Sequence, residues 1–594
     1  MRIFLSLLPL AQLVTPLPAN AVPAISSTPA ASATVISTPP PDPQPETVIT
    51  SPPPSRPNLG NPRPAPSPVR LAPPSTSPLP IAPPVPRPLD VVQPQQVRPL
   101  PGQLDEVPVF NSNSPELIQT EGILLSTFPP GPMQTPSAHL NYPLQGRFDI
   151  FAHHVARGLT PDDVRTLYLG IVVYNPSDRP VTLDLMQAVS YLSQDAPFND
   201  LPSYVANPQG TVFAGPGSRV TNEVLRGERQ PHWPSQIVIP PKNSQLLVNV
   251  PIPLRRLTVA TNGTLPPGAI IPGFPTVATQ TPAAGAQTAA VLPRLTLTAT
   301  GDAAQAATAP VPPTVPARPP VPDNRPLPSN GRTILMHLAS DGPVYLASLA
   351  MFAPRTASGD ERVPTLMEWI DLLRNGTLAG PRDRRPTTPN TRFVGRFFYG
   401  RVAGVAQGSQ WIAQATDGEN AAYLSIPNPG EAISYVLSTV DHNTFGTGQI
   451  QSAPMLVRYP DTAYRAHGNY GVLYSITLPL HNKTDATQRV RIMLQTPLQD
   501  ERLNGEALRF RNPPYDQIFF RGTVRLRYQD DLRIPQTRYF HIVQRRGQQG
   551  EPLLSLTLPR GDRRLVEVQF IYPPDATPPQ VLTVETQAAR TAEQ

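Results

Sequence analysis

Proline most constrains what this chain can fold into, because it is concentrated in two long stretches. The segment 22–100 holds 25 prolines in 79 residues, mixed with Ser, Ala, Thr and Val. Proline has no amide hydrogen to donate to a β-ladder, and a chain this poor in large apolar side chains cannot offset its ordering entropy. We therefore predict a Pro-rich, disordered spacer over 22–100, extended and polyproline-like.

A second biased stretch covers 258–330, with 15 prolines and a patch rich in Ala and Thr. Strand-like sequence continues on both sides of it. We therefore predict a disordered insertion within one folded unit rather than a boundary between domains.

The first 21 residues have the layout of a secretory signal peptide. Arg2 precedes an apolar stretch from Ile3 to about Leu17, and 19–21 reads A-x-A before Val22. Three prolines interrupt this stretch, which is already short for a membrane span of about 20 residues. We predict a signal peptide at 1–21, no transmembrane segment in the mature chain, and export to the periplasm, the cell surface or the extracellular space.

Composition excludes several kinds of chemistry. The chain has no Cys and only two Lys, Lys242 and Lys483, which removes disulfides, thiolate metal sites and cysteine nucleophiles. It contains no G-x-S-x-G, S-x-x-K or H-E-x-x-H pattern. His153 and His154 are adjacent, so on a strand they would point to opposite faces and could not bind one ion together. We expect no catalytic residue, no metal site and no cofactor.

Alternation of apolar and polar residues dominates the segments that can fold, which is typical of strands with one buried face. Two stretches, 167–185 and 472–494, alternate on both sides of turns at 175–178 and 481–485. Each pattern predicts a β-hairpin. Because each is followed by a Pro-containing turn and another strand, we interpret the pair as a weak internal repeat of two β-sandwich units.

We therefore predict a mainly β fold with two β-sandwich-like, Ig-like units. The predicted parts are a first unit at 104–257 plus 331–360, a connecting region at 361–450 with strands, a second unit at 451–587 and a tail at 588–594.

One short helix is predicted in the connecting region, at 365–375. Thr365 and Glu368 form a capping-box pattern, apolar residues recur at helical spacing from Leu366 to Leu373, and Gly376 follows the last turn. We expect its apolar stripe to pack on a sheet, where the two units meet.

Positive charge is concentrated near the C-terminus, since 451–594 has 19 basic and 14 acidic residues, or +5 of the chain's +6. Five arginines alternate with apolar residues on predicted strands and would share an outer face. They are Arg509, Arg511, Arg521, Arg525 and Arg527. Guanidinium groups bind phosphate or carboxylate through paired donors, so this face is the predicted site for an anionic polymer. The alternative is a solvated face that protects a sheet edge from aggregation.

Four stretches resemble a cyanobacterial family of exported proteins defined by a domain of unknown function, number thirty-three seventy. The matching stretches are 98–129, 400–411, 452–472 and 535–552. The resemblance covers roughly 98–587 and implies a photosynthetic bacterial source and an envelope location. It implies no activity, and so assigns no functional residue.

Together these features predict an exported, non-catalytic envelope protein, a structural or interaction module that contacts envelope polysaccharide or another envelope protein, and no nucleic acid. The alternative is a carbohydrate-active enzyme or glycan-binding protein with a site between the two β units. Two carboxylates about 5–10 Å apart in a cleft would favour the enzyme. An uncovered edge strand would instead favour an assembly partner that binds by β-augmentation.

Overall fold

A computed structural model describes residues 88–194, 198–257, 264–269, 327–389, 392 and 395–588. The predicted signal peptide at 1–21 lies outside these residues, as do most of the predicted spacer, insertion and tail. The described part is mainly β, as predicted, and has two α-helices where one was predicted. Neither helix combines the length and apolar character that a membrane crossing requires.

The first β-sandwich has two layers of strands, which share the long strand β14 (Asn330–Phe352). One layer contains β11 (Gln236–Ile239), β9 (Val181–Gln194), β14, β7 (Leu144–Ala156), β4 (Pro108–Ser112), β15 (Ala403–Gln407), β19 (Ala453–Arg458) and β20 (Arg465–Ala466), with β5 (Leu117–Ile118) and β13 (Thr264–Leu265) at its margins. The other layer contains β12 (Ser244–Pro253), β8 (Thr166–Tyr174), β14 and β6 (Gly122–Ser126).

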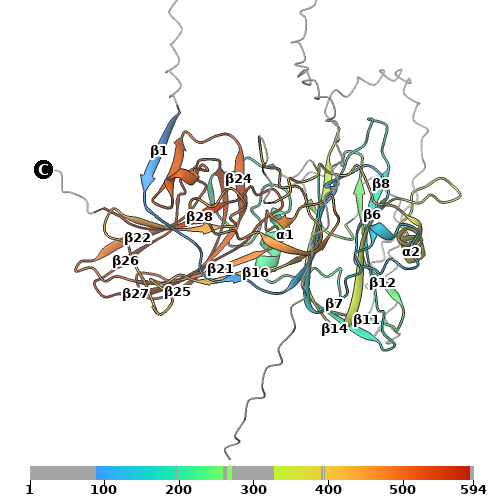
Figure 1. Ribbon diagram of the computed structural model, residues 1–594, viewed down its shortest axis with the longest axis horizontal. Helices are drawn as coiled ribbons and strands as arrows, with labels where there is room; N and C mark the ends of the chain where they lie inside the picture. The colour runs from blue at the N-terminus through green and yellow to red at the C-terminus, as the bar shows by residue number, and fades with distance from the viewer. Residues whose placement is uncertain are drawn as a thin grey trace, which may run out of the picture. The chain divides into compact units, whose positions relative to one another are not determined.

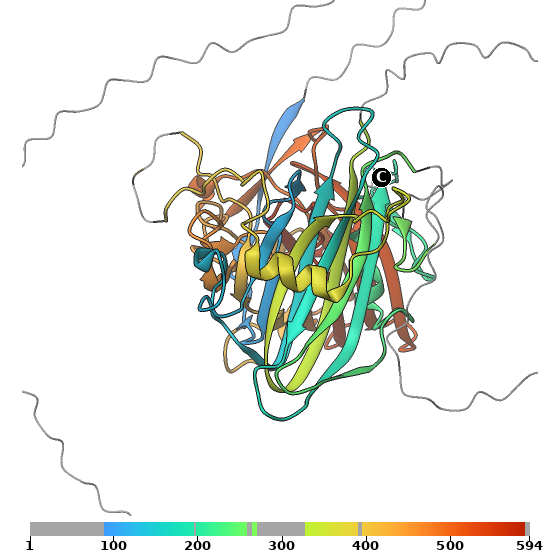
Figure 2. The same cartoon turned by 90° about the vertical axis from the view of Figure 1, so that its right-hand side faces the viewer.

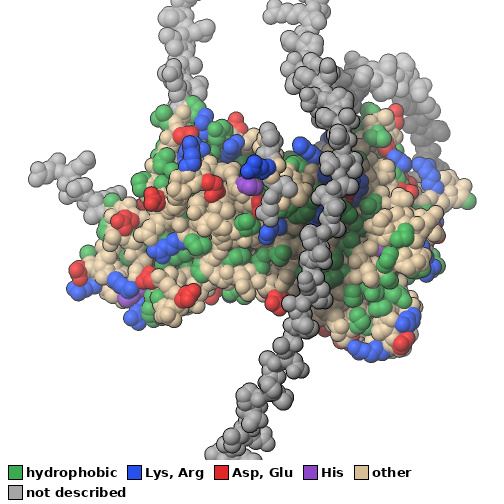
Figure 3. Space-filling view, viewed as in Figure 1, with side chains coloured by type: hydrophobic (Ala, Val, Ile, Leu, Met, Phe, Trp, Pro, Cys, Tyr) green, Lys and Arg blue, Asp and Glu red, His purple; other side chains and the backbone are tan. Residues whose placement is uncertain are grey.

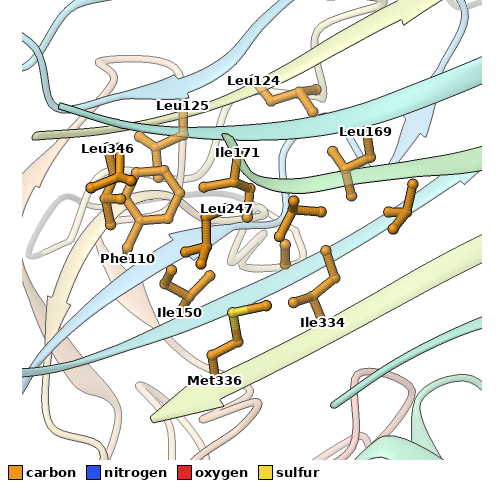
Figure 4. Packing of buried hydrophobic residues seen from close by; sticks show 14 of the residues in the cluster. Phe110, Leu124, Leu125, Ile150, Leu169, Ile171, Leu247, Ile334, Met336 and Leu346 are labelled. Atoms are coloured by element: carbon orange, nitrogen blue, oxygen red, sulfur yellow. The ribbon is translucent and has the colours of Figure 1, made fainter. Parts of the chain in front are cut away.

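Strand β14 belongs to both layers because its two halves pair with different strands. Residues 330–340 pair with β7 and β9, whereas 345–352 pair with β8, and the register with β7 shifts between Ser340 and Val344. The intervening segment contains Pro343, which has no amide hydrogen for a ladder. Figure 4 shows the core that the two layers enclose, where Ile150, Ile334 and Met336 lie across from Ile171 and Leu247.

The second β-sandwich has two separate layers. One contains β10 (Tyr204–Ala206), β25 (Pro535–Arg545), β24 (Ile518–Gln529), β27 (Arg563–Ile571), β21 (Leu473–His481), β16 (Gln410–Gln414), β3 (Gln103–Leu104) and β17 (Leu424–Ser425). The other contains β2 (Gln96–Arg98), β18 (Ala432–Leu437), β28 (Gln580–Thr586), β22 (Gln488–Gln495) and β26 (Pro552–Leu558). Strands β1 (Leu89–Pro94) and β23 (Ala507–Asn512) pair as a small ribbon, and short 3-10 turns occur at Pro136–Ala138 and Glu501–Leu503.

The two predicted hairpins are wrong, although their strands exist. Strand β8 pairs with β12 and β14 while β9 pairs with β11, β13 and β14, so the turn at 175–178 connects the two layers of the sandwich. In the same way β21 pairs with β27 and β22 pairs with β26 and β28. Alternation identifies a strand with one buried face, but it does not say which strand lies beside it.

The hydrogen bonds at these two crossings are equivalent, as the predicted repeat expects. Asn175 donates through Nδ2 to the carbonyls of Arg179, Ile239 and Pro240, and its Oδ1 accepts from the amide and hydroxyl of Ser177. Asn482 makes the equivalent bonds to Ala486, Leu558, Pro559 and Thr484. The strands β8, β9, β11 and β12 therefore correspond to β21, β22, β26 and β27.

The units are more interlocked than the predicted boundaries allow. The region 361–450 forms no layer of its own, since β15 joins the first sandwich and β16, β17 and β18 join the second. Strands β19 and β20, placed in the second unit by the sequence, belong to the first. Strands β1 and β2 lie within 88–100, so the end of the predicted spacer is part of the folded body.

The predicted helix is present as α2 (Leu366–Asn375), with the complete capping box between Thr365 and Glu368. Its apolar stripe packs on β6, β8 and β14, and a Cβ at Gly170 would lie within 2.7 Å of the Trp369 ring. Figure 2 shows α2 across the outward face of the first sandwich, so its expected location between the units is wrong.

The second helix, α1 (Ser218–Leu225), lies where the sandwiches meet and contacts β9 and β14 of one and β24 and β27 of the other (Figure 1). The sequence did not predict it, because its N-cap is Gly217 and no side chain caps its amides.

We expect Asn482→Ala and Asn175→Ala to lower the free energy of unfolding by about 2–3 kcal/mol each, because each leaves buried carbonyls without a donor. Urea unfolding of the purified mature chain measures the change. The exposed Asn375, changed to Ala, is the control and should stay within about 0.5 kcal/mol of wild type. Equal effects of all three substitutions would contradict the structural role of the crossings.

Candidate functional site

The junction between the sandwiches has its own hydrophobic cluster, which α1 completes. Val220, Val224 and Leu225 of α1 pack with Tyr191 of β9 and Ile571 of β27, among others. Two sheets and a helix from distant parts of the sequence thus form one continuous core at this point.

Buried charges lie beside this cluster. Arg521 donates from Nε to Asp575 Oδ2 at 2.8 Å, and a Cβ at Gly215, whose φ is +81°, would lie 2.6 Å from that oxygen. Burial raises the pKa of Asp575 to about 6 despite the opposing effect of Arg521. His541 is fully buried, and burial followed by the charge of Arg521 lowers its pKa to about 4.

Glu116 lies in the same region, but its pKa is shifted in the opposite direction from that of Asp575. Burial acts to raise its pKa, but the hydrogen bonds and charges of His153 and Arg401 outweigh burial and lower the pKa to about 2. His153 Nδ1 contacts Thr333 Oγ1 at 2.8 Å, whereas His154 contacts Ser112 and Pro115 on the other face. The expected divergence of the two histidines is confirmed.

The charge on Asp575 predicts a pH dependence of stability. Its pKa of about 6 in the folded state lies above its ordinary value of 3.8, so the folded chain holds more protons between these values. The contribution of Asp575 to the free energy of unfolding should therefore fall as the pH rises from about 4 to above 6, by up to about 3 kcal/mol, while the lowered pKa of His541 contributes in the opposite direction.

The Asp575→Asn variant should lack this part of the pH dependence, because an amide does not titrate. Urea unfolding of both proteins at intervals from pH 4 to pH 7 measures the difference. Parallel pH profiles for wild type and variant would show that Asp575 does not titrate in this window.

The five arginines predicted as a binding face do not form one surface. Arg509 and Arg511 lie on β23, and Arg521, Arg525 and Arg527 lie on β24, in a different sheet. Each has a partner within the protein. These partners are Asp90 and Asp500 for Arg509, Asp90 for Arg511, Asp575 for Arg521, Gln569 and the Leu225 carbonyl for Arg525, and Glu567 for Arg527.

A different set of arginines lies on a segment that we call the basic loop, residues 382–401. This segment has six Arg and one Asp in twenty residues, a net charge of +5. Its described residues are anchored at both ends. Arg382 donates to both oxygens of Asp461 at 2.9 and 3.0 Å, and the Tyr399 hydroxyl donates to the Asp441 carbonyl at 2.6 Å.

Between these anchors, Arg384, Arg385 and Arg396 are exposed, and none of them forms an ion pair within the described ranges. Arg384 lies 4.9 Å from the centre of the Phe398 ring, and nearby Arg458 lies 3.8 Å from that of Tyr464. Figure 3 shows blue side chains and a histidine gathered in the middle of one face. Exposed arginines without an ion pair therefore lie close to aromatic rings.

Sequence reasoning missed this loop, because charge was summed over the C-terminal part of the chain rather than over short windows. The signal is nevertheless present, as six Arg within 382–401. The three tryptophans offer no comparable surface, since Trp233, Trp369 and Trp411 are all buried.

Next to the base of the loop, His467 Nε2 lies 3.0 Å from Asp441 Oδ2, and Tyr399 packs on the His467 ring at 4.7 Å. The pKa of Asp441 is lowered, first by its hydrogen bond with His467 and also by the charge of Arg465. Within the residues that the structure describes, no group of three His, Asp or Glu side chains is placed to hold a metal ion.

A cavity of about 760 Å³ lies beside α1, and none of its lining residues belongs to the basic loop. Its lining residues are Tyr191, Gln209, Gly210, Thr211, Phe213, Arg219, Asn222, Glu223, Arg226, Glu228, Arg229, Gln230, Pro231, His232, Pro266 and Pro267. Its volume is in the usual range for a small-ligand site, about 300–1,000 Å³.

The two carboxylates of this cavity do not form a free pair. Glu223 Oε1 accepts from the Tyr191 hydroxyl at 2.6 Å and from Arg219 Nε at 3.1 Å, so protein groups already occupy it. Glu228 is exposed. The arrangement presents hydrogen-bonding groups and cations, as a binding site does.

Comparison with known proteins places the chain in a family. Residues 95–586 match the model of a protein family of unknown function, DUF3370. The chain therefore belongs to this family, as its sequence resemblance predicted. No curated protein matches it.

Proposed function

We propose that this chain is an exported, non-catalytic binding protein of the cell envelope that contacts an anionic envelope polymer through its basic loop. The observation that carries the proposal is the group of exposed arginines, Arg384, Arg385 and Arg396, none of which forms an ion pair in the described part of the chain. Guanidinium groups in this state retain their donors for carboxylate or phosphate.

The anchoring of the loop supports the same proposal. Its two ends are held by Asp461 and Asp441, so docking a polymer on it would order fewer residues than docking on a free tail. The aromatic rings of Phe398 and Tyr464 under Arg384 and Arg458 hold those guanidinium groups in place.

Export is part of the proposal and rests on the sequence of residues 1–21. An arginine-rich surface outside the cytoplasm meets acidic glycans and other envelope polymers rather than nucleic acid. The Pro-rich segment that follows would act as a spacer between the folded part and its point of attachment.

The first test removes the loop charges. Arg384→Ser, Arg385→Ser and Arg396→Ser together should lower the retention of the purified chain on isolated envelope material at low salt by at least about tenfold, because three ionic contacts of about 0.5–1 kcal/mol each are lost. High salt should reduce the difference, since it screens exposed charges.

A matched control removes the same charge from arginines that already have acidic partners, Arg502, Arg545 and Arg560. This control should bind nearly as wild type. Equal loss of retention in both triple variants would show that retention depends on the net charge of the chain and not on the loop. Undiminished retention of the loop variant would refute docking at the loop.

The second test concerns export. The full chain, a chain lacking 22–84 and a chain lacking 1–21 should be expressed in the native host and located by cell fractionation. The deletion ends before β1, so the folded part stays whole. The first two should be recovered outside the cytoplasm, with Val22 as the mature N-terminus of the full chain, and the third inside. Cytoplasmic recovery of all three would refute export.

A further inference from the structure

The cavity beside α1 is a second site, separate from the basic loop, and its charges favour an anion. Three arginines line it, Arg219, Arg226 and Arg229, against the two carboxylates Glu223 and Glu228. Glu223 is occupied by Arg219 and by the Tyr191 hydroxyl, as described above. The net charge of the remaining lining residues, Arg226, Arg229 and Glu228, is therefore positive.

Two guanidinium groups, the half-buried one of Arg226 and the buried one of Arg332, strengthen this positive field because their hydrogen bonds go to neutral oxygens. Arg226 donates to the carbonyls of Asn207 and Pro208 and to the Asn222 side chain. Arg332 is 1% exposed and donates to the Pro251 carbonyl and the Ser190 hydroxyl. A buried charge without a counter-ion is costly, and an anion bound nearby offsets part of that cost.

Arg332 acts on the cavity directly. Its charge, together with burial, lowers the pKa of His232, which lines the cavity. His232 is therefore neutral at pH 7 and offers one donor and one acceptor.

The other lining groups are those that bind hydroxyls. Gln230 accepts from the Ser190 amide through Oε1, and its buried Nε2 has no hydrogen-bond partner among the described residues. Gln209 adds a second amide, while Pro266 and Pro267 form an apolar wall. The Asn222 amide is buried and already bound to Gly210 and Arg226. Amides facing an apolar wall suit a ring that carries several hydroxyl groups.

We infer that this cavity binds a hexose unit that carries one anionic group. The inference rests on the proposed function only in taking the envelope ligand to be an anionic glycan. Arg229 is the residue that would meet the charge, because it is exposed and its one hydrogen bond within the described ranges goes to the Leu185 carbonyl at 3.3 Å. Glu228, exposed at the same rim, would oppose the anion.

The test is calorimetric titration of the full mature chain with glucuronate, glucose 6-phosphate and glucose at low salt. At least one anionic hexose should bind about tenfold more tightly than glucose. Binding of glucuronate alone identifies the charged group as a carboxylate, binding of glucose 6-phosphate alone identifies a phosphate, and binding of both leaves the shared negative charge as the determinant.

Two substitutions should move affinity in opposite directions. Arg229→Gln should weaken binding of the anionic hexose by about tenfold, and Glu228→Gln should tighten it by about threefold, since it removes a like charge. Thermal unfolding midpoints equal to wild type confirm that both variants are folded. Failure of both anionic hexoses to bind at millimolar concentration, equal affinity for glucose, or no effect of Arg229→Gln would overturn the inference.

The two sites fail independently. The basic-loop triple variant should bind the anionic hexose as wild type does, and Arg229→Gln should keep its salt-sensitive retention on envelope material. A variant that loses retention on envelope material but still binds the hexose is impaired at the loop alone. A variant that loses hexose binding but is still retained is impaired at the cavity alone.

Discussion

The hydrophobic contact around α1 holds the two sandwiches together, and the rest of the structure depends on it. Val220 and Val224 fill the space between outward faces of two sheets that would otherwise expose Tyr191 and Ile571 to water. The cavity lies on another side of the same helix, so its shape depends on this contact. Because Val220 and Val224 are buried between the sheets, the cavity-lining residues of α1 are held on the other side of the helix.

The internal repeat explains how a helix reaches this position. In the first copy, β10 and α1 are inserted between β9 and β11; in the second, β23, β24 and β25 are inserted between β22 and β26. The two insertions meet, since β10 pairs with β25 and α1 contacts β24. The copies share their Asn-based crossings, and they are joined by the segments in which they differ. The junction is therefore where a duplicated sandwich acquires surfaces that neither copy has alone.

Sequence reasoning recovered what local pattern determines. The capping box at Thr365 and the alternating strands were predicted because each depends on neighbours within about ten residues. Strand partners, the unit boundaries and α1 were not, because they depend on contacts between distant segments. The turns at Asn175 and Asn482 illustrate this limit. The sequence predicted both turns, but the side chains of these residues donate to the carbonyls of Ile239 and Leu558, which lie more than sixty residues away.

The same limit explains why the strand arginines were the wrong place to look for free charge. In an antiparallel sheet every outward residue has a cross-strand neighbour, and that neighbour often compensates it. Arg527 lies opposite Glu567, Arg525 opposite Gln569 and Arg511 opposite Asp90. A loop has no cross-strand register, so an arginine in a loop forms an ion pair only where an acidic residue lies within reach. Arg384, Arg385 and Arg396 form no ion pair in the described structure, in contrast to Arg509, Arg511, Arg521 and Arg527 on the strands.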